Sequence, residues 1–117
     1  MDTTNKKQDE LLYRINNNLK KYQKYLLRCK KQELIAMAGK ITAIHEVYNY
    51  MSSIHIYEED EIDFLLKFIN PLELIADEWS DRSAEFNDIS YTIGIIINRK
   101  EEYLATHPLI NNKTSPT

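Results

Sequence analysis

The stretch LLKFINPLELIADEW, residues 65–79, contains the clearest helix boundary in this chain of 117 residues. Asn70 is a favourable N-cap residue, and Pro71 suits the first turn of a helix, where a missing N–H costs little. Glu73 can complete a start that resembles a capping box. We therefore predict that one helix ends near Ile69 and that a short helix begins at Pro71. The stretch fixes a fold class, but it carries no recognisable catalytic motif.

Apolar residues repeat at helical spacing on both sides of this boundary. The preceding helix is expected from about Glu58 to Ile69, and its acidic first turn suits the positive end of the helix dipole. The predicted inner faces consist of Ile62, Leu65, Leu66 and Ile69 before the boundary, and of Leu72, Ile75, Ala76 and Trp79 after it. Phe64, Phe68 and Leu74 lie off these faces. A helix that is apolar on two faces is central in a core or part of an interface, so these three residues mark a possible contact surface.

Two long helices are expected before this pair. The first runs from about Gln8 to Arg28, and the second runs from about Gln32 to Met51. Their inner stripes repeat at steps of three and four residues, which is typical of one helical face. The stripes contain Leu12, Ile15, Leu19, Tyr22 and Leu26 in the first helix, and Leu34, Met37, Ala38, Ile41, Ile44, Tyr48 and Met51 in the second. His45 lies near the second stripe, and we expect it to be a partly buried, hydrogen-bonded side chain.

The rest of the chain is expected to form one more helix and several loops. Residues 52–57 are interpreted as a loop whose Ile54 or Ile56 enters the core. After a break at 80–83, with Asp81 or Ser83 as the cap, the last helix is expected from about Ala84 to Ala105. Residues 91–97 are rich in β-forming residues, so a strand competes there. The length of the segment and its flanking polar periodicity favour a helix.

These elements predict an all-α fold, a single compact bundle of about five helices. Three helices are long, and two short ones are joined at Asn70-Pro71. The helical domain is expected over residues 8–107, between a disordered N-terminus (1–7) and a flexible C-terminal tail (108–117). Few glycines and prolines, two and three respectively, agree with long helices and few connections.

Composition narrows the class of protein. A hydrophobic content of 43% and a charged content of 28% are ordinary for a globular domain. The N-terminus lacks the apolar segment of a signal peptide, and the longest apolar run, residues 93–97, is too short to span a membrane. Cys29 is the only cysteine and cannot form an internal disulfide. We therefore expect a cytoplasmic protein in which this thiol is packed or half exposed.

The residues that usually carry chemistry do not form a recognisable site. His45, His55 and His107 do not pair at metal-ligand spacings, and two glycines cannot build a phosphate-binding loop. Nothing in the sequence near Cys29 indicates an activated thiol. We therefore predict a protein that is not an enzyme and that needs neither a cofactor nor a metal ion.

Charge is segregated along the chain. Residues 1–57 carry a net charge of +5, residues 58–88 carry −9, and residues 89–117 carry +1. Such asymmetry concerns partners rather than fold. A basic face is predicted on the outside of the first helix, formed by Lys20, Lys24, Arg28 and Lys31. This face is either simply solvated or a site for phosphates or for an acidic protein surface.

The order of these anchors resembles a bacterial domain-of-unknown-function family, number three-eight-four-eight, which is found in Firmicutes and often in their mobile elements. The resemblance covers residues 10–95. The matching residues are Leu11-Leu12-Tyr13, Lys21-Tyr22, Leu26-Leu27, Glu33-Leu34-Ile35, Leu65-Leu66, Pro71-Leu72, Trp79, Asp88-Ile89 and Ile93. The charged run of the family's second helix meets Ile44-His45-Glu46 here. The resemblance implies a small helical protein and supplies no catalytic residues.

Three functions compete. The first is a non-catalytic protein-binding module, encoded by a phage or mobile element, that inhibits or modulates a host protein. One version is an anti-defence (anti-CRISPR-like) inhibitor that occupies the basic channel of a nucleic-acid-guided effector. Its contact surface would be an acidic and apolar corner made of Glu59, Asp63, Phe64, Phe68, Leu74, Asp77 and Glu78. The second is a nucleic-acid-binding accessory protein that uses the basic face. The third is a self-associating protein in which the +5 and −9 segments meet across a homodimer.

Overall fold

The computed structural model describes residues 3–53, 58–82 and 88–110, and in these ranges all regular elements are helices. The helices are α1 (Thr3–Leu27), α2 (Lys31–Ala36), α3 (Ala38–Ser53), α4 (Glu59–Leu66), α5 (Pro71–Arg82), α6 (Ile89–Asn98) and α7 (Lys100–Thr106). The all-α prediction is confirmed. The described part contains seven helices rather than about five, and none of them is long and apolar enough to cross a membrane.

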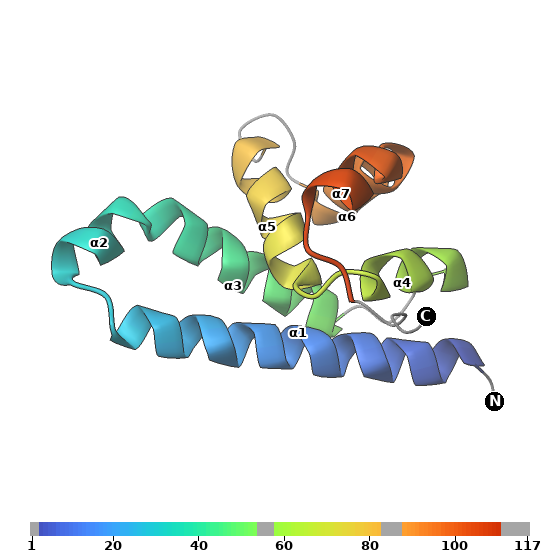
Figure 1. Ribbon diagram of the computed structural model, residues 1–117, viewed down its shortest axis with the longest axis horizontal. Helices are drawn as coiled ribbons and strands as arrows, with labels where there is room; N and C mark the ends of the chain where they lie inside the picture. The colour runs from blue at the N-terminus through green and yellow to red at the C-terminus, as the bar shows by residue number, and fades with distance from the viewer. Residues whose placement is uncertain (1–2, 54–57, 83–87, 111–117) are drawn as a thin grey trace.

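The helices pack around α5. The longest helix, α1, runs along one side of the molecule, and the chain reverses after it and returns through α2 and α3 (Figure 1). The main contacts of α5 are with α3, α1 and α6, while α4 lies against α1. The first turns of α1 and the turn that leads into α2 lie at opposite ends of the molecule (Figure 1). This arrangement places α2 far from the start of α1.

The core contains most of the predicted inner residues. Leu65, Leu72, Ile75 and Trp79 are buried, as the sequence predicts. Each fully buried Leu or Ile stabilises the fold by roughly 1.5–3 kcal/mol relative to an exposed one. The indole N–H of Trp79 donates to Glu46 Oε1 of α3 at 2.8 Å, so its polar atom is also satisfied. The prediction for Ile69 is wrong, because 46% of this side chain is exposed.

The boundary at Asn70 is confirmed. Asn70 Oδ1 accepts a hydrogen bond from the Glu73 N–H at 2.9 Å, which caps the first turn of α5. The preceding helix ends at Leu66, slightly before the predicted Ile69. The N–H groups of Lys67 and Phe68 bond back to carbonyls three residues earlier, which tightens the last turn before the chain leaves the helix.

Two of the predicted long helices are each divided. The second is interrupted at Met37, whose N–H bonds to both the Glu33 and Leu34 carbonyls in a tightened turn. The last helix is interrupted in the same way at Arg99. Residues 91–97 are helical, as expected, within α6. The N-cap of α6 is Asp88, which accepts from the Ser90 N–H at 3.0 Å.

Asp81, one of the two residues predicted to cap the last helix, is not the cap. Asp81 lies inside α5, which continues to Arg82. Ser83 and the predicted start at Ala84 lie outside the described residues, as do Ile54 and Ile56. Ser52 and Ser53 extend α3 rather than beginning a loop.

The described parts of both predicted termini belong to the fold, while residues 1–2 and 111–117 lie outside the described residues. Residues 3–7 belong to α1 and are not disordered, because Lys7 forms ion pairs with Glu59 at 2.7 Å and Asp63 at 2.9 Å that tie the first turns of α1 to α4. Residues 108–110 are not a loose tail. The Pro108 carbonyl accepts from the Ile69 N–H at 3.2 Å, and the Ile110 N–H donates to the Lys67 carbonyl at 2.8 Å. These bonds form a short antiparallel bridge between Phe68 and Leu109.

Candidate binding surfaces

The apolar half of the predicted contact corner is not on the surface. Phe64, Phe68 and Leu74 are buried, with exposed fractions of 4%, 1% and 2%. The rings of Phe64 and Phe68 pack edge to face with centroids 5.1 Å apart, and the ring of His107 lies 6.3 Å from that of Phe68. His107, just after α7, and the bridge at Leu109 therefore cover Phe68, on which Phe64 packs. His107 and Leu109 lie about forty residues after Phe68 in the sequence, so the periodicity within one helix does not predict these contacts.

The acidic half of that corner is divided between two clusters. Glu59 and Asp63 of α4 pair with Lys7 of α1, and these contacts raise the pKa of Lys7 above its usual value. Asp77 of α5 pairs instead with Lys40 of α3, at 3.6 Å. These carboxylates thus pair with cations of the same chain. Among the described residues they do not lie beside the predicted apolar anchors on the surface, because those anchors are buried.

The remaining acid of the corner, Glu78, accepts a hydrogen bond from the hydroxyl of Tyr103 in α7 at 2.7 Å. This contact joins α5 to α7. Glu78 therefore has a structural role between two helices, which the sequence did not indicate.

Lys40 is the centre of the second ionic cluster. It pairs with both Glu73 and Asp77, two acids one turn apart on α5. Burial alone would lower the pKa of Lys40, but the hydrogen bond with Glu73 and the nearby negative charges raise it above its usual value. Burial also raises the pKa of Asp77, although the charge of Lys40 opposes this effect. The cluster therefore holds α3 against α5 by an ionic contact at the edge of the core.

The predicted basic face is exposed. Lys20, Lys24 and Arg28 lie on or just beyond α1, and Lys31 begins α2, so all four are near the turn that joins these helices. In the part of the chain that the structure describes, no carboxylate pairs with any of the four. The four predicted side chains are therefore exposed, and no carboxylate of the described residues neutralises their charge.

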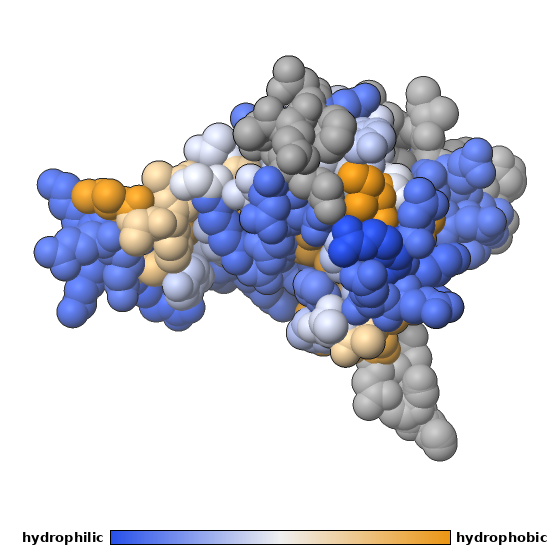
Figure 2. All heavy atoms as spheres, turned by 90° about the horizontal axis from the view of Figure 1, so that it is seen from above, coloured by the Kyte–Doolittle hydropathy of each residue, from blue (hydrophilic) through white to orange (hydrophobic). Residues whose placement is uncertain are grey.

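Sequence reasoning missed an apolar surface in the same place. We define the tip as residues 24–37, which comprise the end of α1, the turn and α2. Leu27 is 86% exposed and Ile35 is 67% exposed. Apolar surface at this end of the molecule lies among hydrophilic residues (Figure 2). None of the six residues of α2, all of them described, is buried.

A signal for this surface is present in the sequence. Leu26-Leu27 and Leu34-Ile35 are adjacent apolar pairs. Neighbouring residues on a helix point about 100° apart, so only one member of each pair can follow the inner stripe. In the structure Leu26 and Leu34 are half buried, while Leu27 and Ile35 face outward.

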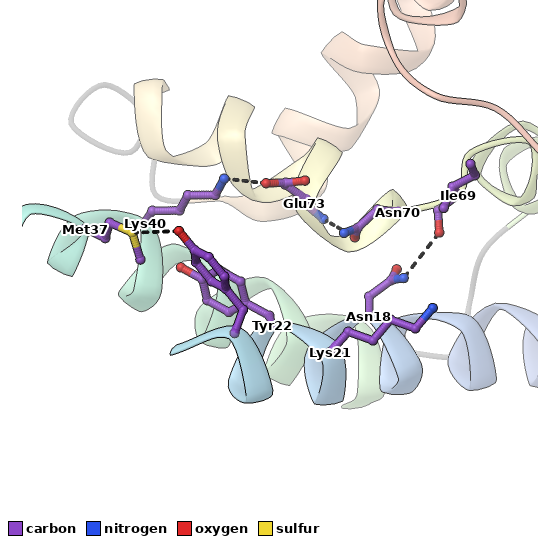
Figure 3. Close-up of a pocket in the computed structure, with 9 residues that line it drawn as sticks. Asn18, Lys21, Tyr22, Met37, Lys40, Ile69, Asn70 and Glu73 are labelled. Carbon is purple, nitrogen blue, oxygen red and sulfur yellow. Dashed lines mark hydrogen bonds and ion pairs between the residues drawn. The ribbon is translucent and has the colours of Figure 1, made fainter. Parts of the chain in front are cut away.

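A pocket lies beside the tip. Its volume is about 370 Å³, and it is lined by Asn18, Lys21, Tyr22, Tyr25, Met37, Lys40, Ile69, Asn70 and Glu73. Asn18 extends from α1 toward Ile69, just before α5, and Lys40 and Glu73 face each other across the pocket (Figure 3). Tyr25 and Met37 belong to both the pocket and the tip, and the Tyr25 hydroxyl lies 3.9 Å from Met37 Sδ. The pocket therefore opens next to the exposed apolar surface.

Two polar atoms that belong to residues lining this pocket are buried without a hydrogen-bond partner among the described residues. They are Asn18 Oδ1 and the hydroxyl oxygen of Tyr22. Burial is also the main reason that the pKa of Tyr22 is raised above its usual value. Buried polar atoms are normally paired, so these two atoms indicate an incomplete polar site.

Chemically reactive residues do not assemble around the pocket or elsewhere in the described ranges. No group of three or more His, Cys, Asp and Glu side chains within these ranges has the geometry of a metal site. The Cys29 thiol is half buried and donates to the Tyr25 carbonyl at 3.4 Å. His45 is half buried, with Nδ1 2.9 Å from the Ile41 carbonyl, as expected for a hydrogen-bonded structural histidine.

Comparisons with known proteins do not extend this description. No family model matches the chain, and neither a curated protein nor a solved structure matches it significantly. The resemblance to the domain-of-unknown-function family thus stays a prediction, and the function has to be inferred from the surfaces themselves.

Proposed function

We propose that this protein is a non-catalytic binding module that docks on an acidic surface of another protein through its tip. The observation that carries the proposal is the exposure of Leu27 and Ile35 in a segment with four exposed cations, namely Lys24, Arg28, Lys30 and Lys31. Protein interfaces commonly combine an apolar centre with a polar rim, and a few central side chains supply most of the binding free energy.

The charge of the tip indicates the kind of partner. Within the tip, residues 24–37, four Lys and Arg residues stand against one acid, Glu33, and Lys20 and Lys21 precede the tip on α1. Complementary charge speeds association and disfavours wrong partners, so the matching surface should be acidic around an apolar hollow. This proposal keeps the predicted modulation of a host protein but moves the contact from the acidic corner to the basic tip.

Inhibition of a nucleic-acid-guided effector is less well supported by this geometry. That hypothesis placed an acidic surface in a basic channel, and it needed Phe64, Phe68 and Leu74 as exposed anchors. These side chains are buried. A basic tip would be repelled by a basic channel, so a partner of this kind would have to offer an acidic surface elsewhere.

Nucleic-acid binding is a second candidate because of one further observation. Tyr13 is 69% exposed and lies on the outer side of α1 with Lys20 and Lys24. Exposed aromatic rings beside a row of cations are typical of surfaces that bind single-stranded nucleic acid. This candidate gives no role to Leu27 and Ile35, which have no ring to stack on a base.

Self-association has weaker support from charge. The basic and acidic segments already meet within one chain, where Lys7 contacts α4 and Lys40 contacts α5. The segregated charge therefore does not require a second copy to be compensated.

The proposal can be tested by affinity capture with cross-linking from a lysate of the host cell. Two variants change the tip: Leu27→Ser/Ile35→Ser removes the apolar anchors, and Lys24→Glu/Arg28→Glu reverses the rim. The proposal requires that both variants lose the same captured protein. It also requires that Asp or Glu→Lys changes on that protein restore capture of the charge-reversed variant.

Matched controls separate the candidates. Tyr13→Ser removes an exposed apolar ring away from the tip, and Lys100→Glu reverses an exposed charge on α7. Both should keep protein capture. Binding of single-stranded RNA or DNA at low salt that depends on Tyr13 and Lys24, but not on Leu27, would favour the nucleic-acid candidate instead. Capture that survives both tip variants would exclude the proposed surface.

A further inference from the structure

The pocket beside the tip holds two unpaired polar atoms whose chemistry restricts its ligand. Asn18 is 93% buried, since its exposed fraction is 7%. Its Nδ2 donates to the Ile69 carbonyl at 3.2 Å. A carbonyl oxygen only accepts, so this bond fixes which end of the amide is the nitrogen. The oxygen is turned away from Ile69 (Figure 3), and it needs a donor that no described residue supplies.

The Tyr22 hydroxyl adds a group that can both donate and accept. It lacks a partner among the described residues, although Lys40 and Glu73 also line the pocket. Those two residues are bonded to each other, so neither is free to serve it fully. Asn18 and Tyr22 lie one turn apart on α1 and both line the pocket, so its wall contains one acceptor and one hydroxyl, both enclosed by protein atoms.

The ionic pair in the pocket does not select a small anion. Glu73 largely neutralises Lys40, the Lys21 side chain extends along α1 rather than toward that pair (Figure 3), and Asn18 Oδ1 repels negative charge. The walls are partly apolar, because the rings of Tyr22 and Tyr25, 6.2 Å apart, lie there with Met37 and the half-exposed Ile69. A volume of about 370 Å³ is at the small end of ligand pockets. A neutral group with one donor, one acceptor and an apolar flank fits these walls.

We propose that this pocket binds a peptide amide, with an N–H donating to Asn18 Oδ1 and a carbonyl oxygen accepting from the Tyr22 hydroxyl. The amide would come from a main-chain segment of the partner, so this inference rests on the proposed function. Tyr25 and Met37 link the two surfaces, because they belong to both the tip and the pocket. A chain seated on Leu27 and Ile35 would thus continue toward Asn18.

The proposal can be tested without the partner. N-acetyl-leucine N-methylamide is titrated into the full-length protein and followed by NMR at the Asn18 side-chain amide and the Tyr22 ring. Saturable shifts at both residues are expected. Asn18→Leu and Tyr22→Phe should each weaken binding by about fivefold to tenfold, the value of about one hydrogen bond. No shift up to the solubility limit would mean that the pocket holds water only, and it would overturn the proposal.

Thr92→Val is a matched control. Thr92 Oγ1 is also buried without a partner among the described residues, but it lies on α6 and does not line the pocket. Thr92→Val should leave binding of the probe unchanged, and an equal loss of binding in this variant would overturn the proposal. Preferential binding of uridine over the blocked leucine would assign the pocket to a nucleobase and would also overturn it.

A thermal measurement adds an independent readout. Removing a buried hydroxyl that has no partner should leave the melting temperature unchanged or raise it. Tyr22→Phe is therefore expected to bind the probe less well while it melts no earlier than wild type. A lower melting temperature would mean that the hydroxyl is already bonded in the free protein. The residues changed in the tip variants, Lys24, Leu27, Arg28 and Ile35, do not line the pocket. Loss of partner capture in these variants and loss of probe binding are therefore separate results.

Discussion

Arg14 of α1 donates a hydrogen bond from Nη1 to the carbonyl oxygen of Phe68 at 2.7 Å. The same nitrogen donates to the Leu66 carbonyl at 3.1 Å. The last carbonyls of a helix have no partner within it, so they need donors from elsewhere. Arg14 supplies two such bonds where α4 ends. The half-buried arginine thereby fixes the segment that leads into α5, the central helix of the fold.

Arg14→Met should lower the free energy of unfolding by about 1.5–3 kcal/mol, because it keeps much of the apolar stem but removes charged donors from carbonyls that it partly buries. Urea denaturation measures this change. Arg99→Met is the control, since the guanidinium of Arg99 makes an exposed pair with Glu102 at 3.0 Å, and the loss of stability in this variant should be much smaller. Equal losses in the two variants would contradict the structural role of Arg14.

Phe68 and Ile69 provide a second test. The sequence predicts that Ile69 is buried and that Phe68 belongs to a contact surface, whereas in the structure Phe68 is buried and Ile69 is half exposed. Phe68→Ala should destabilise the protein by about 3–5 kcal/mol, as expected for a buried aromatic side chain. Ile69→Ala should have a clearly smaller effect, because almost half of that side chain is exposed. Equilibrium unfolding of the two variants compares adjacent positions. A larger loss of stability in Ile69→Ala than in Phe68→Ala would contradict the structure and support the predicted contact corner.

The boundary at Asn70 could be predicted because its cause is local. An N-cap and a proline at adjacent positions decide it, and the bond from the Glu73 N–H to Asn70 appears in the structure, while the Glu73 carboxylate pairs with Lys40. The inner positions Leu65, Leu72 and Ile75 were predicted for a similar reason. Their spacing places them on one face, and a face of this kind is normally buried.

Burial of Phe64, Phe68 and Leu74 could not be predicted in this way. Phe68 is covered with the help of His107 and the bridge at Leu109, about forty residues further along the chain, and Phe64 packs on Phe68. Which second face is covered depends on the path of the later chain, and periodicity within one helix contains no information about that path. The ion pairs Lys7–Glu59 and Lys40–Glu73 also join residues that are far apart in sequence, by 52 and 33 positions.

The candidate sites were partly predictable. The cations of the basic face were found from their spacing, and they are exposed as a set. The pocket was not found, because Asn18 is one of three successive asparagines and only packing distinguishes it from Asn16 and Asn17. Its burial depends on the approach of Ile69, which lies in another part of the sequence.

The cap of α5 gives a third prediction. Asn70→Ala should lower the free energy of unfolding by about 1 kcal/mol, because the Glu73 N–H loses its acceptor. Asn70→Ser keeps a side-chain oxygen at the cap and should retain most of the stability. Urea denaturation of both variants measures the difference. If serine is as harmful as alanine, the role of Asn70 lies in another contact, such as its place in the pocket.

The tip should tolerate changes that a core would not. Leu27→Ser/Ile35→Ser is expected to change the free energy of unfolding by no more than about 0.5 kcal/mol, since both side chains are mainly exposed. Thermal unfolding and circular dichroism test this directly. Ile75→Ser, at a fully buried position, is the contrasting variant and should be strongly destabilised. A large loss in the tip variant would show that these residues support the fold, and it would remove the reason to regard them as anchors.

Asp77 gives a prediction that depends on pH. Burial raises its pKa in the folded protein above the ordinary value of 3.8, despite the neighbouring Lys40. A folded state that holds the proton more tightly is favoured at low pH, and this contribution is lost as the pH rises through the raised pKa. At neutral pH the charged Asp77 therefore disfavours the fold. Asp77→Asn should raise the free energy of unfolding at pH 7, by less than about 1 kcal/mol because water screens the half-exposed group.

The gain from Asp77→Asn should vanish near pH 3, where the wild-type carboxyl is protonated and both side chains are neutral. Chemical denaturation at pH 7 and pH 3 measures the two differences. Asp63→Asn serves as the control, because it removes a partner of Lys7 at 2.9 Å and should give no gain at pH 7. A loss of stability in Asp77→Asn at pH 7 would mean that attraction to Lys40 outweighs the burial of Asp77. The ionic cluster would then stabilise the contact between α3 and α5 through both of its acids.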